Sequence, residues 1–175
     1  MLEDFLQEHP DSVEALRELT QVALEENKFA EAEECLRKVL KHYPNDYRSL
    51  HTLHGCVLRL GRKAEARKLA EQLERVRRFE RQLDDLLRVK LRARPKDPEV
   101  RYQIGFIYEQ LGLQTQASQW FLRALTVSPF HTEALKGMVR YHEERGEKEK
   151  ANQYRAGITQ RDASRPPAGQ DARPQ

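Results

Sequence analysis

The sequence is poor in cysteine and has no long apolar run, and each absence excludes a class of protein. Two cysteines, Cys35 and Cys56, occur without a Cys-x-x-Cys pair among 175 residues, which fits buried reduced thiols rather than a disulfide framework. No stretch approaches the roughly 18 uninterrupted apolar residues of a membrane helix. The first residues lack the basic and apolar segments of a secretion signal. We therefore expect a cytoplasmic protein without membrane association.

Motifs of reaction chemistry are also missing. The eight glycines are scattered, and neither a phosphate-binding loop nor the GxSxG or HExxH motif occurs. Adjacent carboxylates such as Glu33 and Glu34 point about 100° apart on a helix and do not act together on one substrate atom. His51 and His54 share a helical face, but two ligands fall short of a metal site. We expect no enzyme: no catalytic residue, no metal, no cofactor and no small-molecule substrate.

Charge is distributed unevenly along the chain. Residues 1–46 carry 5 Lys and Arg against 12 Asp and Glu, whereas residues 47–175 carry 26 against 16. One interpretation is an ordinary solvated helix surface. The other is a surface that selects partners of opposite charge.

What the sequence does contain is a repeat. Pro10 and Pro44 are 34 residues apart, as are Pro95 and Pro129, and each proline follows an apolar helical run. Between Pro98 and His131 the apolar residues predict two helices separated at Gly112, with the stripes Ile104, Ile107, Tyr108 and Leu111, then Ala117, Trp120, Phe121, Ala124 and Leu125. This pattern predicts a helical hairpin.

The same segment resembles the tetratricopeptide repeat. The residues that carry the resemblance are Gly105, Tyr108, Ala117, Phe121, Ala124 and Pro129; Arg101 stands where the family usually has Trp. The small residues Gly105 and Ala117 let two helices approach closely, and Phe121 pairs a bulky side chain with the small Ala124. The resemblance implies an all-α fold, an α-solenoid of antiparallel helix pairs.

Extending this frame gives the domain organisation. We expect one segment for each repeat or cap: a partial helix or cap at 1–12, repeats at 13–46 and 47–80, an extra half-repeat helix at 81–97, a repeat at 98–131, a partial repeat or cap at 132–160 and a disordered tail at 161–175.

The middle of the chain departs from the period. From Pro44 to Pro95 is 51 residues, one repeat and a half. Residues 64–94 contain neither Gly nor Pro, so we favour one continuous helix of about 31 residues. The alternative is a bend at residues 77–79 that makes two helices.

The resemblance also implies a site, because first helices of such repeats line a concave groove. The residues at the groove-facing positions are Arg17, Gln21, Arg48, His51, Arg59, Tyr102, Phe106, Lys136 and Arg140. Mostly donors, they favour an acidic peptide or protein segment with one apolar anchor. We expect a protein-interaction scaffold or adaptor. Two alternatives stay open, self-assembly of a homo-oligomer through the long helix and single-stranded RNA binding, although we do not expect nucleic acid as the partner.

Overall fold

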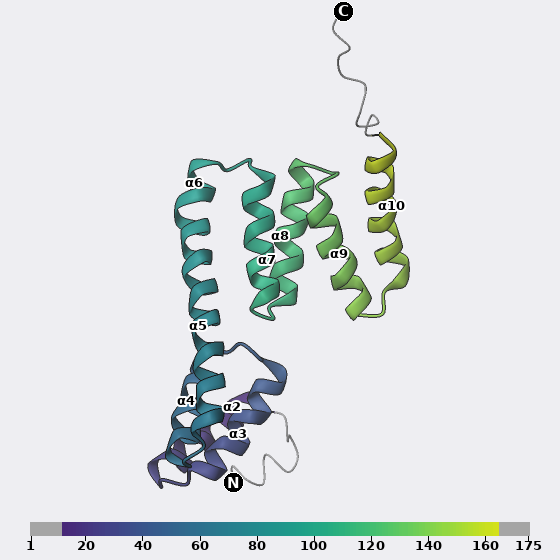
Figure 1. The fold of residues 1–175 in the computed structure, drawn as a ribbon. Helices are drawn as coiled ribbons and strands as arrows, with labels where there is room; N and C mark the ends of the chain where they lie inside the picture. The colour runs from purple at the N-terminus through teal and green to yellow at the C-terminus, as the bar shows by residue number, and fades with distance from the viewer. Residues whose placement is uncertain (1–11, 165–175) are drawn as a thin grey trace, which may run out of the picture. The chain divides into compact units, whose positions relative to one another are not determined.

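The computed structural model describes residues 12–164, and all regular structure in that part of the chain is helical (Figure 1). Residues 1–11 and 165–175, which include most of the expected N-terminal cap, lie outside it. The elements are α2 (Val13–Glu25), α3 (Phe29–His42), α4 (Tyr47–Arg59), α5 (Lys63–Asp85), the π-helix η1 (Leu86–Lys90), α6 (Leu91–Ala93), α7 (Pro98–Gln110), α8 (Gln114–Val127), α9 (Thr132–Glu144) and α10 (Lys148–Ser164). The predicted all-α fold of repeated helix pairs is confirmed.

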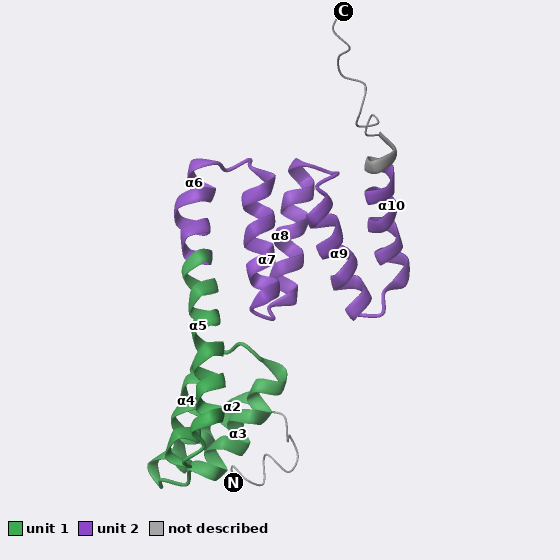
Figure 2. Cartoon of the chain, in the orientation of Figure 1, with its two compact units in different colours: residues 1–82 green, residues 83–175 purple. Residues whose placement is uncertain are grey.

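The chain divides into two compact units. Unit 1 comprises residues 1–82 and unit 2 residues 83–175, so the boundary falls within α5 (Figure 2). In unit 1, α3 packs against both α2 and α4. In unit 2, α8 packs against α7 and α9, and α10 packs against α9.

Four helix pairs turn in the same way. The second residue after the first helix adopts a left-handed backbone, with φ of 59° at Asn27, 76° at Gly61, 79° at Gly112 and 72° at Gly146. In the third pair, the Gly112 and Leu113 amides donate hydrogen bonds of 2.9 Å to the carbonyls of Glu109 and Tyr108. Glycine suits these positions because it has no Cβ to clash, and the bonds satisfy carbonyls at the helix end.

The first helix of each pair also starts in a characteristic way. Side chains of Ser12, Asp46, Asp97 and His131 accept hydrogen bonds from backbone amides in the first turns of α2, α4, α7 and α9. Such caps satisfy amides that have no partner within the helix. Pro98, the first residue of α7, lacks the amide that would otherwise remain unpaired.

The core of unit 2 is built around one aromatic ring. Phe121 is 1% exposed and packs with Ala117, Ala124, Ala134 and Met138. Ala117 is also 1% exposed and Gly105 is buried, which confirms that these small residues lie between helices rather than facing water.

The core of unit 1 contains Ala32, Leu36, Leu53, Cys56 and Val57. Both cysteines are free thiols, as expected. Cys56 is buried, but Cys35 is only partly so, which corrects the expectation of two buried thiols. The reason is its place on α3, next to the buried stripe formed by Ala32, Leu36 and Val39.

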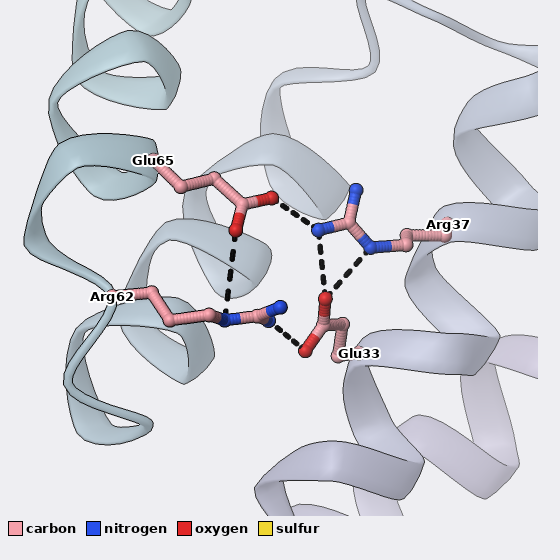
Figure 3. A network of polar contacts seen from close by, with 4 residues as sticks. All are labelled: Glu33, Arg37, Arg62 and Glu65. Atoms are coloured by element: carbon pink, nitrogen blue, oxygen red, sulfur yellow. Dashed lines mark hydrogen bonds and ion pairs between the residues drawn. The ribbon is translucent and has the colours of Figure 1, made fainter.

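An ion-pair network ties α3 to the start of α5 (Figure 3). The carboxylate of Glu33, on a residue that is 8% exposed, accepts hydrogen bonds from Arg62 and, at 2.7 Å, from Nε of Arg37. Arg37 also pairs with Glu65, and Arg62 Nε lies 3.5 Å from Glu65 Oε2. These bonds lower the pKa of Glu33, chiefly through Arg62, despite the opposing effect of burial.

The long central helix is continuous. α5, η1 and α6 follow one another directly, and the residues at the junctions, Asp85, Lys90 and Leu91, keep a right-handed helical backbone. The alternative, a bend at residues 77–79, is absent, since α5 runs through them. The π-helical turn at Leu86–Lys90 was not predicted.

The last helix is longer than expected. α10 continues to Ser164, whereas the sequence placed the start of a disordered tail at 161. Residues 161–164 contain no helix breaker, and Arg165 is followed by Pro166, which disfavours a helical backbone at the residue before it. The remaining tail residues, 165–175, lie outside the described part.

Candidate functional site

Five of the nine predicted groove residues belong to unit 1, and all five are exposed. Arg17 and Gln21 stand one helical turn apart on α2, and Arg48, His51 and Arg59 follow one face of α4. The two helices are the first members of successive pairs, so their caps and turns set these side chains in equivalent positions.

The first hollow on this surface has a volume of about 380 Å³. Three predicted residues, Arg17, Gln21 and Arg48, line it. Its apolar lining is Leu24 and Leu36. Glu14 and Glu18 line it as well, so carboxylates and guanidinium groups are balanced there.

A second hollow of about 310 Å³, here called the Gly55 hollow, adjoins the first, since Leu24 and Thr52 line both. The other two predicted residues of unit 1, His51 and Arg59, line it. Its remaining lining is Phe29, Gly55 and Cys56. Together the two hollows form what we call the α2–α4 groove.

The cations of the groove differ in their partners. Arg17 Nη2 lies 3.5 Å from Asp46 Oδ1. Arg48 and Arg59 form no ion pair with any residue in the described range 12–164. The Arg59 guanidinium lies 4.9 Å from the centre of the Phe29 ring, and the His51 ring stacks on Tyr47 at 6.0 Å. The Arg59 guanidinium is therefore positioned by the face of an aromatic ring and not by a carboxylate of residues 12–164.

The other four predicted residues belong to unit 2, where Tyr102 packs against the core and Phe106 is exposed. The Tyr102 ring stacks on Phe121 at 5.9 Å and lies 5.2 Å from the His131 ring. Burial raises the pKa of the Tyr102 hydroxyl. Phe106, 6.1 Å from Tyr102, is 38% exposed.

The two predicted cations of unit 2, Lys136 and Arg140, are already paired. Arg140 donates two hydrogen bonds of 2.9 Å to the carboxylate of Glu109, and Lys136 Nζ lies 2.8 Å from Glu133 Oε1. The bonds to Glu109 raise the pKa of Arg140 further. Binding an acidic group at Lys136 or Arg140 requires competition with these carboxylates, whereas Arg48 and Arg59 have no ion-pair partner to lose among residues 12–164.

Sequence reasoning missed ten of the fifteen residues that line the groove, among them Leu24, Phe29 and Gly55. A signal for Gly55 existed: it lies four residues after His51 and four before Arg59, on the same stripe of α4. It was passed over because glycine offers no side chain for a contact.

Within residues 12–164, no three His, Cys, Asp or Glu side chains are arranged to hold a metal ion. No helix in this range is long and apolar enough to cross a bilayer.

Comparison with solved structures gives only distant likeness. A crystal structure of MamA protein is 15% identical and covers 94% of this chain and 100% of its own, with a TM-score of 0.47. YrrB, described as a TPR protein with an unusual peptide-binding site, is 14% identical over 94% of this chain and 93% of its own, with a TM-score of 0.44. MamA from Desulfovibrio magneticus RS-1 is 14% identical over 94% and 83%, with a TM-score of 0.41. No curated protein sequence matches.

The family comparison covers most of the chain. Models described as tetratricopeptide repeat match residues 1–55, 23–90 and 98–131. The last range is the segment on which the repeat pattern was first read, and its helix pair is α7 and α8. The chain belongs to the tetratricopeptide-repeat family.

Proposed function

We propose that the chain is a protein-interaction scaffold whose α2–α4 groove binds an extended segment of a partner protein. The observation that carries the proposal is the pair of adjoining hollows, which together are lined by all five predicted groove residues of unit 1. Repeats of this family build interaction surfaces from their first helices, and α2 and α4 are such helices. An extended segment suits two hollows placed in series better than a compact ligand does.

Charge supports an acidic partner at one end of the groove. Among residues 12–164, His51 and Arg59 line the Gly55 hollow, no carboxylate does, and Arg59 has no ion-pair partner. The first hollow, by contrast, carries Glu14 and Glu18 beside Arg17 and Arg48. The partner's acidic residues are therefore assigned to the Gly55 end, where they meet a cation without displacing a carboxylate.

The test is a selection of random dodecapeptides displayed on phage against the full chain. Enriched peptides are synthesised, and their Kd is measured by fluorescence anisotropy. We expect Arg48→Glu and Arg17→Glu each to weaken binding about tenfold or more, because each reverses a charge that lines the groove.

The matched control is Arg67→Glu, the same charge reversal at an exposed residue of α5 that lines neither hollow. Its Kd is expected to stay within about twofold of the wild-type value. Failure to enrich any peptide, or enriched peptides that bind Arg48→Glu and Arg17→Glu as tightly as the wild type, would contradict the proposed function.

A further inference from the structure

Gly55 lies in the interior of α4, a place where glycine weakens a helix. Several other glycines among residues 12–164 have an evident structural reason. Gly61 has a left-handed backbone, with φ of 76°, and a Cβ on Gly105 would stand 2.7 Å from the Phe121 ring. At Gly55 the backbone is helical, and an added Cβ would meet no heavy atom within 4 Å. Neither backbone conformation nor packing within the described chain requires glycine there.

The space that Gly55 leaves open is the Gly55 hollow. Its apolar lining is Leu24, Phe29 and Cys56. Burial raises the pKa of the Cys56 thiol, so this part of the lining is uncharged. A pocket with apolar walls and a floor of bare helix backbone admits a side chain that any larger residue at position 55 would exclude.

We infer that the Gly55 hollow is an anchor pocket: it receives one large apolar side chain of the partner segment, and an acidic residue beside that side chain pairs with Arg59. This inference rests on the proposed function and adds the chemistry of the segment. Burying one leucine- or phenylalanine-sized side chain against Leu24 and Phe29 supplies affinity, as central anchors do in other interfaces. The positive charge of Arg59 favours an acidic residue of the partner segment next to the anchor side chain.

Charge complementarity selects this partner over other segments. A basic neighbour would face the Arg59 guanidinium, and no carboxylate among residues 12–164 lines the hollow to offset the repulsion. The Arg59 guanidinium lies 4.9 Å from the centre of the Phe29 ring. This contact holds the positive charge at the wall of the pocket. The occupant is therefore an apolar residue flanked by Asp or Glu.

The experiment uses the peptides selected on the full chain and a size series at one position, Gly55→Ala, Gly55→Val and Gly55→Met. We expect the enriched peptides to share one apolar position flanked by Asp or Glu. Affinity should fall as the new side chain grows, reaching a loss of about tenfold or more with Gly55→Met. Circular dichroism and thermal melting establish that each variant is folded.

A double-mutant cycle tests the acidic neighbour. Replacing that residue of the peptide by its amide, and Arg59→Gln in the protein, should each weaken binding, and the two losses together should be smaller than their product. The matched control for size is Ala64→Met, which adds the same side chain at an exposed residue of α5 outside the hollow and should leave the Kd within about twofold.

The outcomes separate the two proposals. If peptides bind and are weakened by Arg48→Glu yet are indifferent to Gly55→Met, the groove stands and the anchor pocket is wrong. If the fold-losses in affinity from Arg59→Gln and from the amide replacement in the peptide simply multiply, Arg59 does not pair with the peptide carboxylate. If light scattering shows a dimer that Gly55→Met dissolves, and a peptide of residues 1–11 competes with it, the occupant is a second copy of this chain, which overturns the assignment to a partner protein.

Discussion

The ring of Phe121 in α8 lies directly against the backbone of Gly105 in α7, where a Cβ would stand 2.7 Å from two ring carbons. On the other side of the ring system, a Cβ on Gly137 in α9 would stand 2.5 Å from it. The ring is 1% exposed and has glycine contacts from two helices, so it has little room to shift.

Gly105→Ala should therefore destabilise unit 2. Alanine gains about 1 kcal/mol of helix propensity over glycine, but the overpacking against Phe121 costs about 1–3 kcal/mol. We expect a net loss of up to about 2 kcal/mol in the free energy of unfolding. The fluorescence of Trp120, the single tryptophan, reports urea unfolding of α8.

The control is the pair Phe121→Leu and Gly105→Ala/Phe121→Leu. The smaller side chain opens a cavity but removes the clash, so Gly105→Ala should cost less in the Phe121→Leu background than alone. Equal costs in both backgrounds would mean that the Gly105 contact with Phe121 does not limit the helix approach.

Gly55→Ala should have the opposite effect. No heavy atom lies within 4 Å of the Cβ position, so the substitution causes no clash. Alanine also has a higher helix propensity than glycine. We expect the free energy of unfolding of unit 1 to rise by about 0.5–1 kcal/mol. Hydrogen exchange of the α4 amides measures it. A loss of stability would show that the hollow above Gly55 closes in solution.

Glu33→Gln should destabilise unit 1, and the effect should depend on pH. The carboxylate binds Arg37 and Arg62, and removing its charge from a residue that is 8% exposed should cost about 1–3 kcal/mol at pH 7. Because the folded-state pKa of Glu33 lies below its ordinary value of 4.5, its stabilising effect is complete above that value and is lost as pH falls through the lowered pKa.

Urea unfolding followed by circular dichroism at pH 7, 5, 4 and 3 gives the difference between wild type and variant at each pH. The difference should be constant above pH 5 and should shrink below about pH 4. Glu34→Gln, at the next and exposed position, is the matched control. A pH-independent difference would place the cost in side-chain packing rather than in the ion pairs.

Much of the fold follows from the sequence because small and bulky residues recur at one period. Gly112 marks the end of α7 with a left-handed backbone, and Phe121 with Gly105 marks where α7 and α8 meet. These are local requirements that few residue types satisfy. The contact of Gly137 with the same ring escaped prediction, since it depends on how α9 crosses α8 and not on any local pattern.

The candidate site was predictable only in part. The family resemblance implied groove-facing positions for Arg48, His51 and Arg59 on α4, and these residues line the two hollows. The resemblance says nothing of which cations have partners. Arg140 and Glu109 are 31 residues apart in sequence and meet only through the packing of α7 and α9.

The structural role of Arg101 was also not predicted, because the sequence shows only that Arg101 stands where the family usually has Trp. In the structure its guanidinium joins two backbone segments. Nη1 donates to the carbonyl of Arg123 in α8 at 2.9 Å, and Nη2 donates to the carbonyl of Pro95, just before α7, at 2.7 Å. One planar group thus fixes the entry to α7 and its approach to α8.

Arg101→Lys should lower the stability of unit 2 by about 1–2 kcal/mol, because a single ammonium does not span both carbonyls and one hydrogen bond is lost. Trp120 fluorescence during urea unfolding measures the loss. Arg94→Lys is the control: its side chain is 71% exposed and lies 3.6 Å from Asp97, so the same replacement there should change stability by less than about 0.5 kcal/mol. Equal effects at positions 94 and 101 would mean that the bridge between Pro95 and Arg123 contributes nothing to the packing of α7 on α8.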